Sequence, residues 1–237
     1  VVKSEGKAKY ALGSVLGHVL LHQTINGNEA ILQMEQAGDY PDIIVGCTGG
    51  GSNLAGLMFP FLGQQLRGGQ KIDIIGCEPL SCPSFTKGKY AYDHGDMARM
   101  TPLIKMHTLG SDFLPPANHS GGLRYHGMSY HLSHLYDLGL MRAKAYGQKD
   151  CFEAGVIFGK QEGIIPAPEG NHAVKGAIDA ALECKEKGES KTILFNLCGH
   201  GHFDMTAYDD YFSGKLADDF YDEKSANQSL SKLPEIA

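Results

Sequence analysis

The sequence predicts an α/β fold in which helices cover both faces of a parallel β-sheet. Three short runs, at 42–47, 71–77 and 192–197, are mainly apolar and contain several β-branched residues. This pattern is typical of strands that are buried on both faces of a parallel sheet. Helical segments separate the runs, and a strand, a crossover helix and a second parallel strand form the basic unit of such sheets.

Apolar residues recur at helical spacing in four further segments, 9–36, 54–66, 150–163 and 171–187. We expect the first helix to be broken near Asn26-Gly27, a turn-forming pair. Residues 81–150 lack a clear period and are rich in Gly, His, Pro and Tyr, and long irregular segments of this kind usually carry function. We predict one domain over 1–214 and a polar, loosely held tail over 215–237.

Composition excludes two classes of function. The 237 residues are 42% hydrophobic and 20% charged, as in ordinary folded chains. A net charge of -6 without a basic cluster argues against nucleic-acid binding. The longest apolar stretches fall short of the roughly 20 residues that span a membrane, so we expect no membrane partner. Six scattered cysteines without a Cys-x-x-Cys pair indicate a reducing, cytoplasmic compartment and give little support for structural zinc.

The strongest chemical signal is Gly49-Gly50-Gly51-Ser52-Asn53, directly after the first predicted strand. Glycines have no Cβ to block an anion from the backbone N–H groups, and the following helix adds the partial positive charge of its N-terminus. We predict that residues 49–53 bind a phosphate group. No Gly-Lys-Ser or Gly-Lys-Thr follows, and Leu54 replaces the last glycine of the dinucleotide motif. The alternative is a tight turn in which the glycines serve only packing.

Two further candidates stand at the predicted carboxyl edge of the sheet, where open α/β sheets bind ligands. Glu169 follows an extended segment with two prolines and precedes a helix, so it either caps that helix or contacts a ligand. Cys198 follows the third strand and is either a polar partner of a ligand or a small buried filler, which is the simpler interpretation.

The segment 118–128 is polar and flexible and contains Arg124. It either closes over an anionic substrate, because a guanidinium binds a carboxylate through two hydrogen bonds, or is a surface loop held by a salt bridge. Histidines at metal-compatible spacing lack the adjacent carboxylate of zinc hydrolases, which argues against a transition-metal site; they are His131, His134, His200 and His202. No Gly-x-Ser-x-Gly occurs, so serine hydrolase chemistry has no support.

Four ordered motifs resemble those of the tryptophan synthase β-chain family. They are 49–53 after a strand, Gly-Cys-Glu-Pro at 76–79, the run 162–169, and Asn-Leu-Cys-Gly at 196–199. The segments 109–113 and 119–128 are similar to the second, more divergent branch of that family. The resemblance extends over about residues 8–213. It implies the C-terminal part of a fold-type II pyridoxal phosphate (PLP) enzyme, and therefore an incomplete domain.

The resemblance implies a lyase of tryptophan biosynthesis that joins L-serine to indole and yields L-tryptophan with PLP as cofactor. By that resemblance, residues 49–53 would hold the cofactor phosphate and Glu169 would lie beside the pyridine ring. Cys198, followed by Gly199, would face the ring nitrogen where the family usually has serine, an equally uncharged group. Asp112 would contact the serine-derived hydroxyl, and Glu78 would contribute to a monovalent-cation site.

One departure from the family concerns its Schiff-base lysine, which lies in a Ser-His-Lys sequence in the N-terminal half. No His-Lys pair occurs in this chain. We therefore expect a chain that is inactive alone and associates with a complementary N-terminal fragment, with a second copy in a homodimer, or with an α-subunit. Two alternatives remain open. One is another fold-type II enzyme of the threonine synthase or serine dehydratase type, and the other is a non-catalytic fragment that binds a phosphate ligand.

Overall fold

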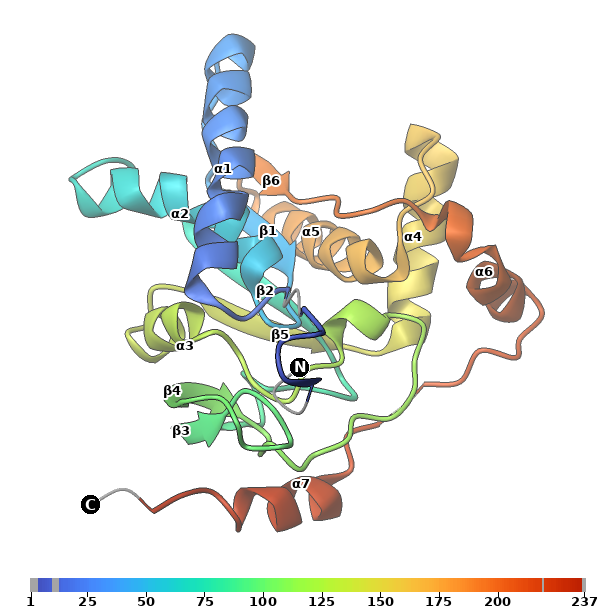
Figure 1. Ribbon diagram of the computed structural model, residues 1–237. Helices are drawn as coiled ribbons and strands as arrows, with labels where there is room; N and C mark the ends of the chain where they lie inside the picture. The colour runs from blue at the N-terminus through green and yellow to red at the C-terminus, as the bar shows by residue number, and fades with distance from the viewer. Residues whose placement is uncertain (1–3, 10–12, 219, 236–237) are drawn as a thin grey trace.

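A computed structural model describes residues 4–9, 13–218 and 220–235 of the chain (Figure 1). Its centre is a four-stranded parallel sheet in the order β5-β2-β1-β6. The strands are β1 (Ile43–Cys47), β2 (Asp73–Pro79), β5 (Arg142–Tyr146) and β6 (Ile193–Phe195). The predicted α/β class and parallel sheet are confirmed, and the three predicted strands differ from the observed ones by at most two residues at either end.

Helices lie on both faces of this sheet, as Figure 1 shows. The helices of the described residues are α1 (Gly17–Ala37), α2 (Ser52–Leu66), α3 (Tyr130–Asp137), α4 (Gln148–Glu162), α5 (Pro168–Lys187), α6 (Met205–Phe212) and α7 (Glu223–Leu230). Figure 1 shows α6 outside α4 and α7 beyond the β3–β4 hairpin (89–108), away from the sheet. Two short 3-10 turns, η2 (Gly121–Leu123) and η3 (Gly201–Phe203), interrupt the connections. Within the described residues, none of the helices combines the length and the apolar character needed to cross a membrane.

The central strands divide the hydrophobic core between the two faces, because successive side chains of a strand point in opposite directions. Ile44 and Ile74 are buried in one cluster with residues of α1, α2 and α3. Val45 and Ile75 belong to a second cluster with residues of α4 and α5. Both faces of β1 are therefore covered, and this accounts for its continuously apolar sequence.

The first helix is continuous, so the predicted break near Asn26-Gly27 is wrong. A Cβ atom on Gly27 would lie 2.4 Å from the carbonyl oxygen of Leu57, and one on Gly56 would lie 2.5 Å from that of Gln23. Each glycine therefore allows the backbone of the opposite helix to approach closely where α1 packs on α2. The Asn26-Gly27 pair resembles a turn in the sequence, but its glycine is there because the two helices pack closely.

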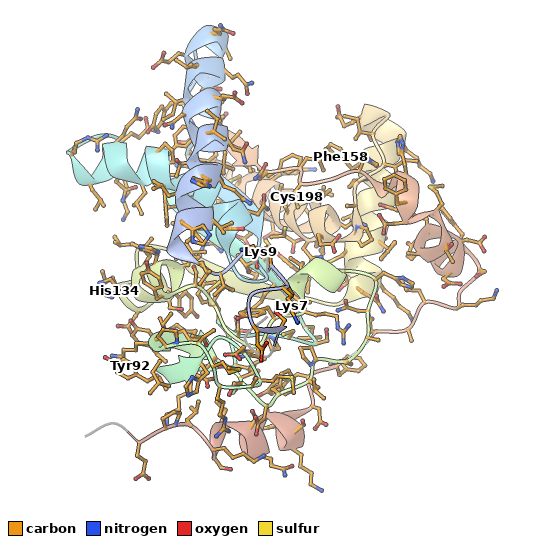
Figure 2. All side chains as sticks on the ribbon, viewed as in Figure 1. Lys7, Lys9, Tyr92, His134, Phe158 and Cys198 are labelled. Carbon is orange, nitrogen blue, oxygen red and sulfur yellow. The ribbon has the colours of Figure 1, made fainter. Side chains whose placement is uncertain are left out.

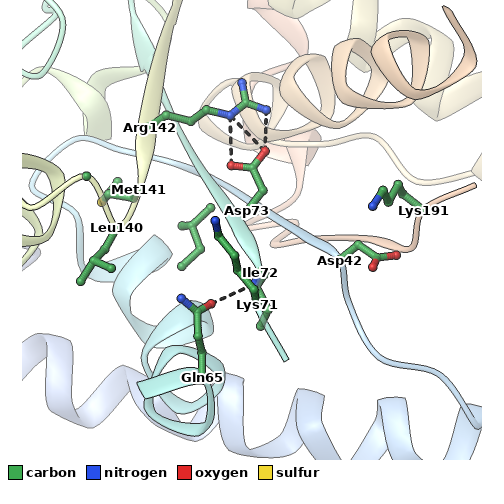
Figure 3. Close-up of a pocket in the computed structure, with 11 residues that line it drawn as sticks. Asp42, Gln65, Lys71, Ile72, Asp73, Leu140, Met141, Arg142 and Lys191 are labelled. Carbon is green, nitrogen blue, oxygen red and sulfur yellow. Dashed lines mark hydrogen bonds and ion pairs between the residues drawn. The ribbon is translucent and has the colours of Figure 1, made fainter. Parts of the chain in front are cut away.

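The irregular segment 81–150 contains more regular structure than its sequence indicates. It forms an antiparallel hairpin of β3 (Lys89–His94) and β4 (Leu103–Thr108), then α3 and the edge strand β5. Arg142 of β5 donates hydrogen bonds to both carboxylate oxygens of Asp73 on β2, at 2.7–3.1 Å. Figure 3 shows this pair in a pocket of about 550 Å³ at the amino ends of the strands, opposite the edge where ligands usually bind.

The C-terminal tail is packed rather than loosely held. Ala226 of α7 is fully buried in a cluster with Leu109 and Phe113, and Leu216 is buried against Phe152 and Tyr208. The expectation of a loose tail is therefore wrong for these residues, because small and apolar side chains spaced among the polar ones bury against the domain. The division of the chain at residue 214 stays a prediction.

Candidate functional site

The carboxyl ends of β1 and β6 bring the glycine loop and the segment 196–199 to the same edge of the sheet. The ladder continues beyond both strands, because the Thr48 amide donates to the Cys77 carbonyl at 2.8 Å and the Asn196 amide donates to the Val45 carbonyl at 3.1 Å. These bonds fix the direction in which each connecting segment leaves the sheet. The resulting edge is where open α/β sheets bind ligands.

The glycine triplet leaves no space for side chains. A Cβ atom would lie 2.5 Å from the Gly122 carbonyl oxygen at Gly49, 2.5 Å from Ser14 Oγ at Gly50, and 2.4 Å from a methyl group of Leu132 at Gly51. Gly51 also has a φ of 101°, a backbone conformation that favours glycine. The packing role offered as the alternative from sequence is thus real, and three segments distant in the sequence converge on this loop.

The polar atoms around the triplet match the acceptor oxygens of a phosphate. Within the described residues, the amides of Gly49, Gly50 and Gly51 have no hydrogen-bond acceptor, whereas the Ser52 amide donates to the Ser14 carbonyl at 3.1 Å. The buried hydroxyls of Thr48 and Ser129 also lack a partner there. A buried polar group without a partner costs about 1–3 kcal/mol, and an anion at a helix N-terminus would satisfy several such groups at once.

Asn53 connects the loop to the opposite segment of the site. Its side-chain Nδ2 donates to Cys47 Sγ at 3.2 Å, and its side-chain oxygen accepts a hydrogen bond from the Asn196 side chain. Cys47 Sγ in turn lies 3.3 Å from Cys198 Sγ. Cys198, labelled in Figure 2, therefore belongs to a continuous chain of polar contacts that begins in the first turn of α2.

Glu169 anchors the loop at 119–128. It lies in the first turn of α5, and its Oε1 accepts a hydrogen bond from the Gly122 amide at 2.8 Å. The bond joins two distant segments, and among the described residues the Glu169 carboxylate makes no capping hydrogen bond to its own helix. Leu123 packs against Cys47 in the same cluster as Cys198. The structure thus brings the loop at 119–128 to Glu169, Cys198 and the glycine triplet.

Arg124 in this loop donates a hydrogen bond to the Pro115 carbonyl at 2.6 Å. Its guanidinium holds backbone there and forms no ion pair with a described residue. Two histidines of the same loop do face carboxylates, His119 at 3.8 Å from Asp210 and His126 at 3.7 Å from Asp93, so both interpretations of the loop stay predictions. Gly199 has a φ of 73° and accepts a hydrogen bond from the Ala167 amide at 3.3 Å. Gly199 therefore lies at the turn that places Cys198 beside the start of α5.

Asp112 has its described contacts away from this cluster. Lys232 donates to its carboxylate at 2.9 Å and Arg99 lies 3.5 Å away, and the hydrogen bond from Lys232 is the main reason that the pKa of Asp112 is lowered. The Asp112 amide also donates to Ser229 Oγ of α7 at 3.2 Å. The described contacts therefore join Asp112 to the C-terminal helix, and its role toward a substrate stays a prediction.

Glu78 is fully buried at the end of β2. Its carboxylate accepts hydrogen bonds from the Phe85 amide at 2.9 Å and from the amide and hydroxyl of Thr86 at 2.9 and 2.6 Å. Burial nevertheless raises the pKa of Glu78 to about 7. Both oxygens bind protein groups, and the described residues contain no cluster of three or more His, Cys, Asp or Glu side chains that could hold a metal. The monovalent-cation role stays a prediction.

Several residues near the site were not singled out from sequence. Cys47 and Thr48 immediately precede the glycine triplet, and their position at the end of a buried strand is a signal that could have identified them. Asn196, at the equivalent position after β6, belongs to the motif at 196–199 that the sequence does single out. Ser129 reaches the loop only through the tertiary fold, so no local pattern points to it.

The fold and this edge define a class of protein, the open parallel α/β domains with a glycine-rich loop at the carboxyl edge of the sheet. The structure is similar to an L-serine ammonia-lyase from the fungus Rhizomucor miehei, with a TM-score of 0.64 over 91% of this chain and 64% of that chain at 14% identity. It is also similar to the threonine deaminase of T.th., with a TM-score of 0.54 over 79% of this chain and 53% of that chain at 16% identity. At these identities the likeness shows the fold alone.

Residues 18–199 match the pyridoxal-phosphate dependent enzyme family, and the chain belongs to this family. The predicted cofactor class is therefore confirmed. The chain is 58% identical to "Tryptophan synthase beta chain 2" of Aquifex aeolicus over 91% of this chain and 50% of the relative. It is 58% identical to the same-named protein of Methanosarcina mazei over 88% and 47%, and 51% identical to "Tryptophan synthase beta chain" of Pyrococcus horikoshii over 98% and 50%. The chain thus spans about half the length of these curated relatives, and the predicted resemblance is confirmed.

Replacing Glu169 with Ala will release the loop at 119–128, because the Gly122 amide loses its acceptor. Arg124 is exposed and offers trypsin a cleavage site within this loop. We expect limited trypsin digestion to cut after Arg124 about tenfold faster in Glu169→Ala, which corresponds to about 1.4 kcal/mol in the opening equilibrium. Glu162→Ala, at the exposed end of α4, is the matched control. Equal cleavage rates in the two variants would show that Glu169 does not hold the loop.

Glu78 should make the free energy of unfolding depend on pH. Because its pKa of about 7 in the folded chain lies above the ordinary 4.5, folding favours the protonated carboxyl. This contribution is full below about pH 4.5 and is lost as the pH rises through about 7, a decrease of about 3 kcal/mol. Glu78→Gln resembles the protonated form and should flatten the profile measured by urea unfolding. The exposed variant Glu162→Gln should keep the wild-type slope, and a Glu78→Gln profile as steep as the wild type would contradict the assignment.

Proposed function

We propose that this chain is the cofactor-phosphate half of a tryptophan synthase β-type enzyme. The reaction is the PLP-dependent replacement of the hydroxyl group of L-serine by indole, which gives L-tryptophan. The observation that carries the proposal is the 58% identity to tryptophan synthase beta chain 2 of Aquifex aeolicus over 91% of this chain. The loop geometry supports it independently, because backbone amides without an acceptor among the described residues meet at a helix N-terminus on the ligand-binding edge of the sheet.

In this proposal, residues at the carboxyl edge of the sheet bind the phosphate of the cofactor. The amides of residues 49–51, with the hydroxyls of Thr48 and Ser129, hold the phosphate. Ser52 and Asn53 open the helix whose N-terminus faces it. Once bound, PLP withdraws electrons from the substrate Cα, so that a β-substituent can leave and a nucleophile can replace it.

Cys198 and Glu169 act beside the cofactor ring in this proposal. The thiol of Cys198, with the turn at Gly199 behind it, contacts the ring nitrogen as a weak and uncharged partner, so the nitrogen need not become protonated. Glu169 holds the loop at 119–128 through the Gly122 amide, and this loop covers the site and keeps water out.

Two roles are proposed on resemblance alone. Asp112 contacts the hydroxyl of the serine substrate, which requires that Lys232 and Arg99 release its carboxylate. Glu78 contributes to a monovalent-cation site, which requires that it give up a hydrogen bond from Phe85 or Thr86. Both proposals therefore include a rearrangement of the contacts described above.

The cofactor lysine is supplied in this proposal by a complementary N-terminal polypeptide, because no His-Lys pair occurs in the chain. The chain alone is then inactive. We also propose association with a second copy and with an α-subunit, in a reducing cytoplasm where the six cysteines stay free.

Co-expression tests the proposed function. The chain is expressed with the N-terminal half of the Aquifex aeolicus relative, and tryptophan formation from L-serine and indole is measured by chromatography. We expect product only when both polypeptides are present, and none from either alone. If the chain binds PLP but the pair forms no tryptophan, the cofactor assignment stands and the proposed reaction is wrong.

Asn53→Asp tests the phosphate loop. The substitution keeps the size of the side chain and its acceptor for Asn196, and it removes the side-chain donor to Cys47 Sγ. A negative charge in the first turn of a helix is compatible with its dipole. It also places like charge beside the proposed phosphate. We expect the affinity for PLP, measured by equilibrium dialysis, to fall at least about tenfold, or about 1.4 kcal/mol.

Two controls accompany this measurement. Asn28→Asp adds the same charge on the exposed face of α1 and should bind PLP like the wild type. Pyridoxal lacks the phosphate and should bind both variants equally weakly. If Asn53→Asp and Asn28→Asp bind PLP with the same affinity, residues 49–53 do not hold the phosphate.

A further inference from the structure

Two cysteines meet at the carboxyl edge of the sheet. Cys47 is the last residue of β1, Cys198 follows the neighbouring strand β6, and their Sγ atoms lie 3.3 Å apart. A disulfide has an S–S length of about 2.05 Å, so the two sulfurs need to approach by only about 1.3 Å. All six cysteines are free thiols, and this is the one sulfur-to-sulfur contact among the described residues.

The two thiols differ in a way that suits sequential oxidation. Cys47 is buried, whereas Cys198 is the one cysteine of the six that is not fully buried and can meet a small solute. The hydrogen bond with Cys47 lowers the pKa of Cys198, although the nearby charge of Glu169 opposes this. The same hydrogen bond and burial raise the pKa of Cys47. Thiolates react with oxidants and thiols do not, so Cys198 reacts first and Cys47 stays a thiol beside it.

We propose that Cys47 and Cys198 form a peroxide-sensitive thiol pair that closes to a reversible disulfide. In the first step the Cys198 thiolate attacks a peroxide oxygen: an S–O bond forms, the O–O bond breaks, and hydroxide leaves and takes up a proton. In the second step Cys47 transfers its proton to the sulfenic oxygen and attacks the sulfenic sulfur as a thiolate: the S–S bond forms, the S–O bond breaks, and water leaves. The two thiols lose two electrons and one hydrogen peroxide becomes two waters.

Closure of the pair reaches the glycine loop through Asn53. The side-chain Nδ2 of Asn53 donates to Cys47 Sγ, and the same side chain accepts from Asn196. Movement of Cys47 Sγ toward Cys198 strains both bonds, and it removes the Cys198 thiol that faces the ligand. The effect on cofactor binding rests on the proposed function, whereas the formation of the disulfide does not.

Peptide mapping of the oxidised chain tests the pair directly. The 237-residue chain is treated with a small excess of hydrogen peroxide, free thiols are alkylated under denaturing conditions, and the protein is digested with trypsin. Cleavage after Lys9 and Arg67, and after Lys191 and Lys215, leaves Cys47 and Cys198 as the single cysteines of peptides 10–67 and 192–215. We expect these two peptides to appear as one linked species that dithiothreitol separates.

Variants identify the order of reaction. Cys184→Ser, which removes a buried thiol elsewhere, should keep the linked species. Cys47→Ser should lose it and should accumulate Cys198 as sulfinic acid, because no neighbouring thiol traps the first product. If peroxide leaves Cys198 reduced in the wild-type chain, or oxidises it without linking it to Cys47, the proposal is wrong.

A binding measurement separates this proposal from the proposed function. The oxidised chain should bind PLP at least about tenfold more weakly than the reduced chain and recover after dithiothreitol. If the reduced chain does not bind PLP, the proposed function is wrong. The linked peptides still show whether Cys47 and Cys198 form a disulfide. If both forms bind PLP equally, the proposed effect of the disulfide on the site is wrong.

Discussion

The close approach of three distant segments to the glycine triplet is the constraint on which the site depends. Ser14, Gly122 and Leu132 each lie where a Cβ atom on one of the three glycines would clash. The triplet can therefore be enclosed while its amides stay free of protein acceptors within the described residues. Close packing and anion binding are usually alternative explanations of a glycine-rich loop. Here close packing favours anion binding, because enclosure of the loop lowers the local dielectric constant and strengthens the interaction between an anion and the amide dipoles.

Hydrogen bonds of two side chains connect the glycine triplet to the rest of the carboxyl edge of the sheet. Asn53 joins the first turn of α2 to Cys47 and Asn196, and Glu169 joins the first turn of α5 to Gly122. Each connection begins at a helix N-terminus, where side-chain position is determined within the first turn. The site is thus built from two helix starts and two strand ends. A thiol pair between those strand ends lies at the place where a small covalent change has the largest effect on the loop.

The sequence predicts the parts of this arrangement that depend on local pattern. Mainly apolar runs predict β1, β2 and β6, because the side chains of these strands are largely buried. The sequence does not predict β5, because this edge strand carries the charged residues Arg142 and Lys144. These two residues form ion pairs with Asp73 and Glu183. The break expected at Gly27 is wrong because close helix packing and a turn both favour glycine. The motifs at 49–53, Glu169 and Cys198 come together as expected, since strand ends share one edge. The contacts of Asp112 with α7 depend on more than a hundred intervening residues, so no local signal could reveal them.

The surface of α1 exposes a stripe of apolar side chains. Leu21, Ile25 and Leu32 follow one another at helical spacing and are exposed by 67%, 56% and 59%. Burying three such side chains is worth roughly 1.5–3 kcal/mol each, which is a large fraction of the stability of an ordinary domain. In the proposed enzyme the complementary polypeptide covers this stripe, and the chain spans about half the length of its curated relatives.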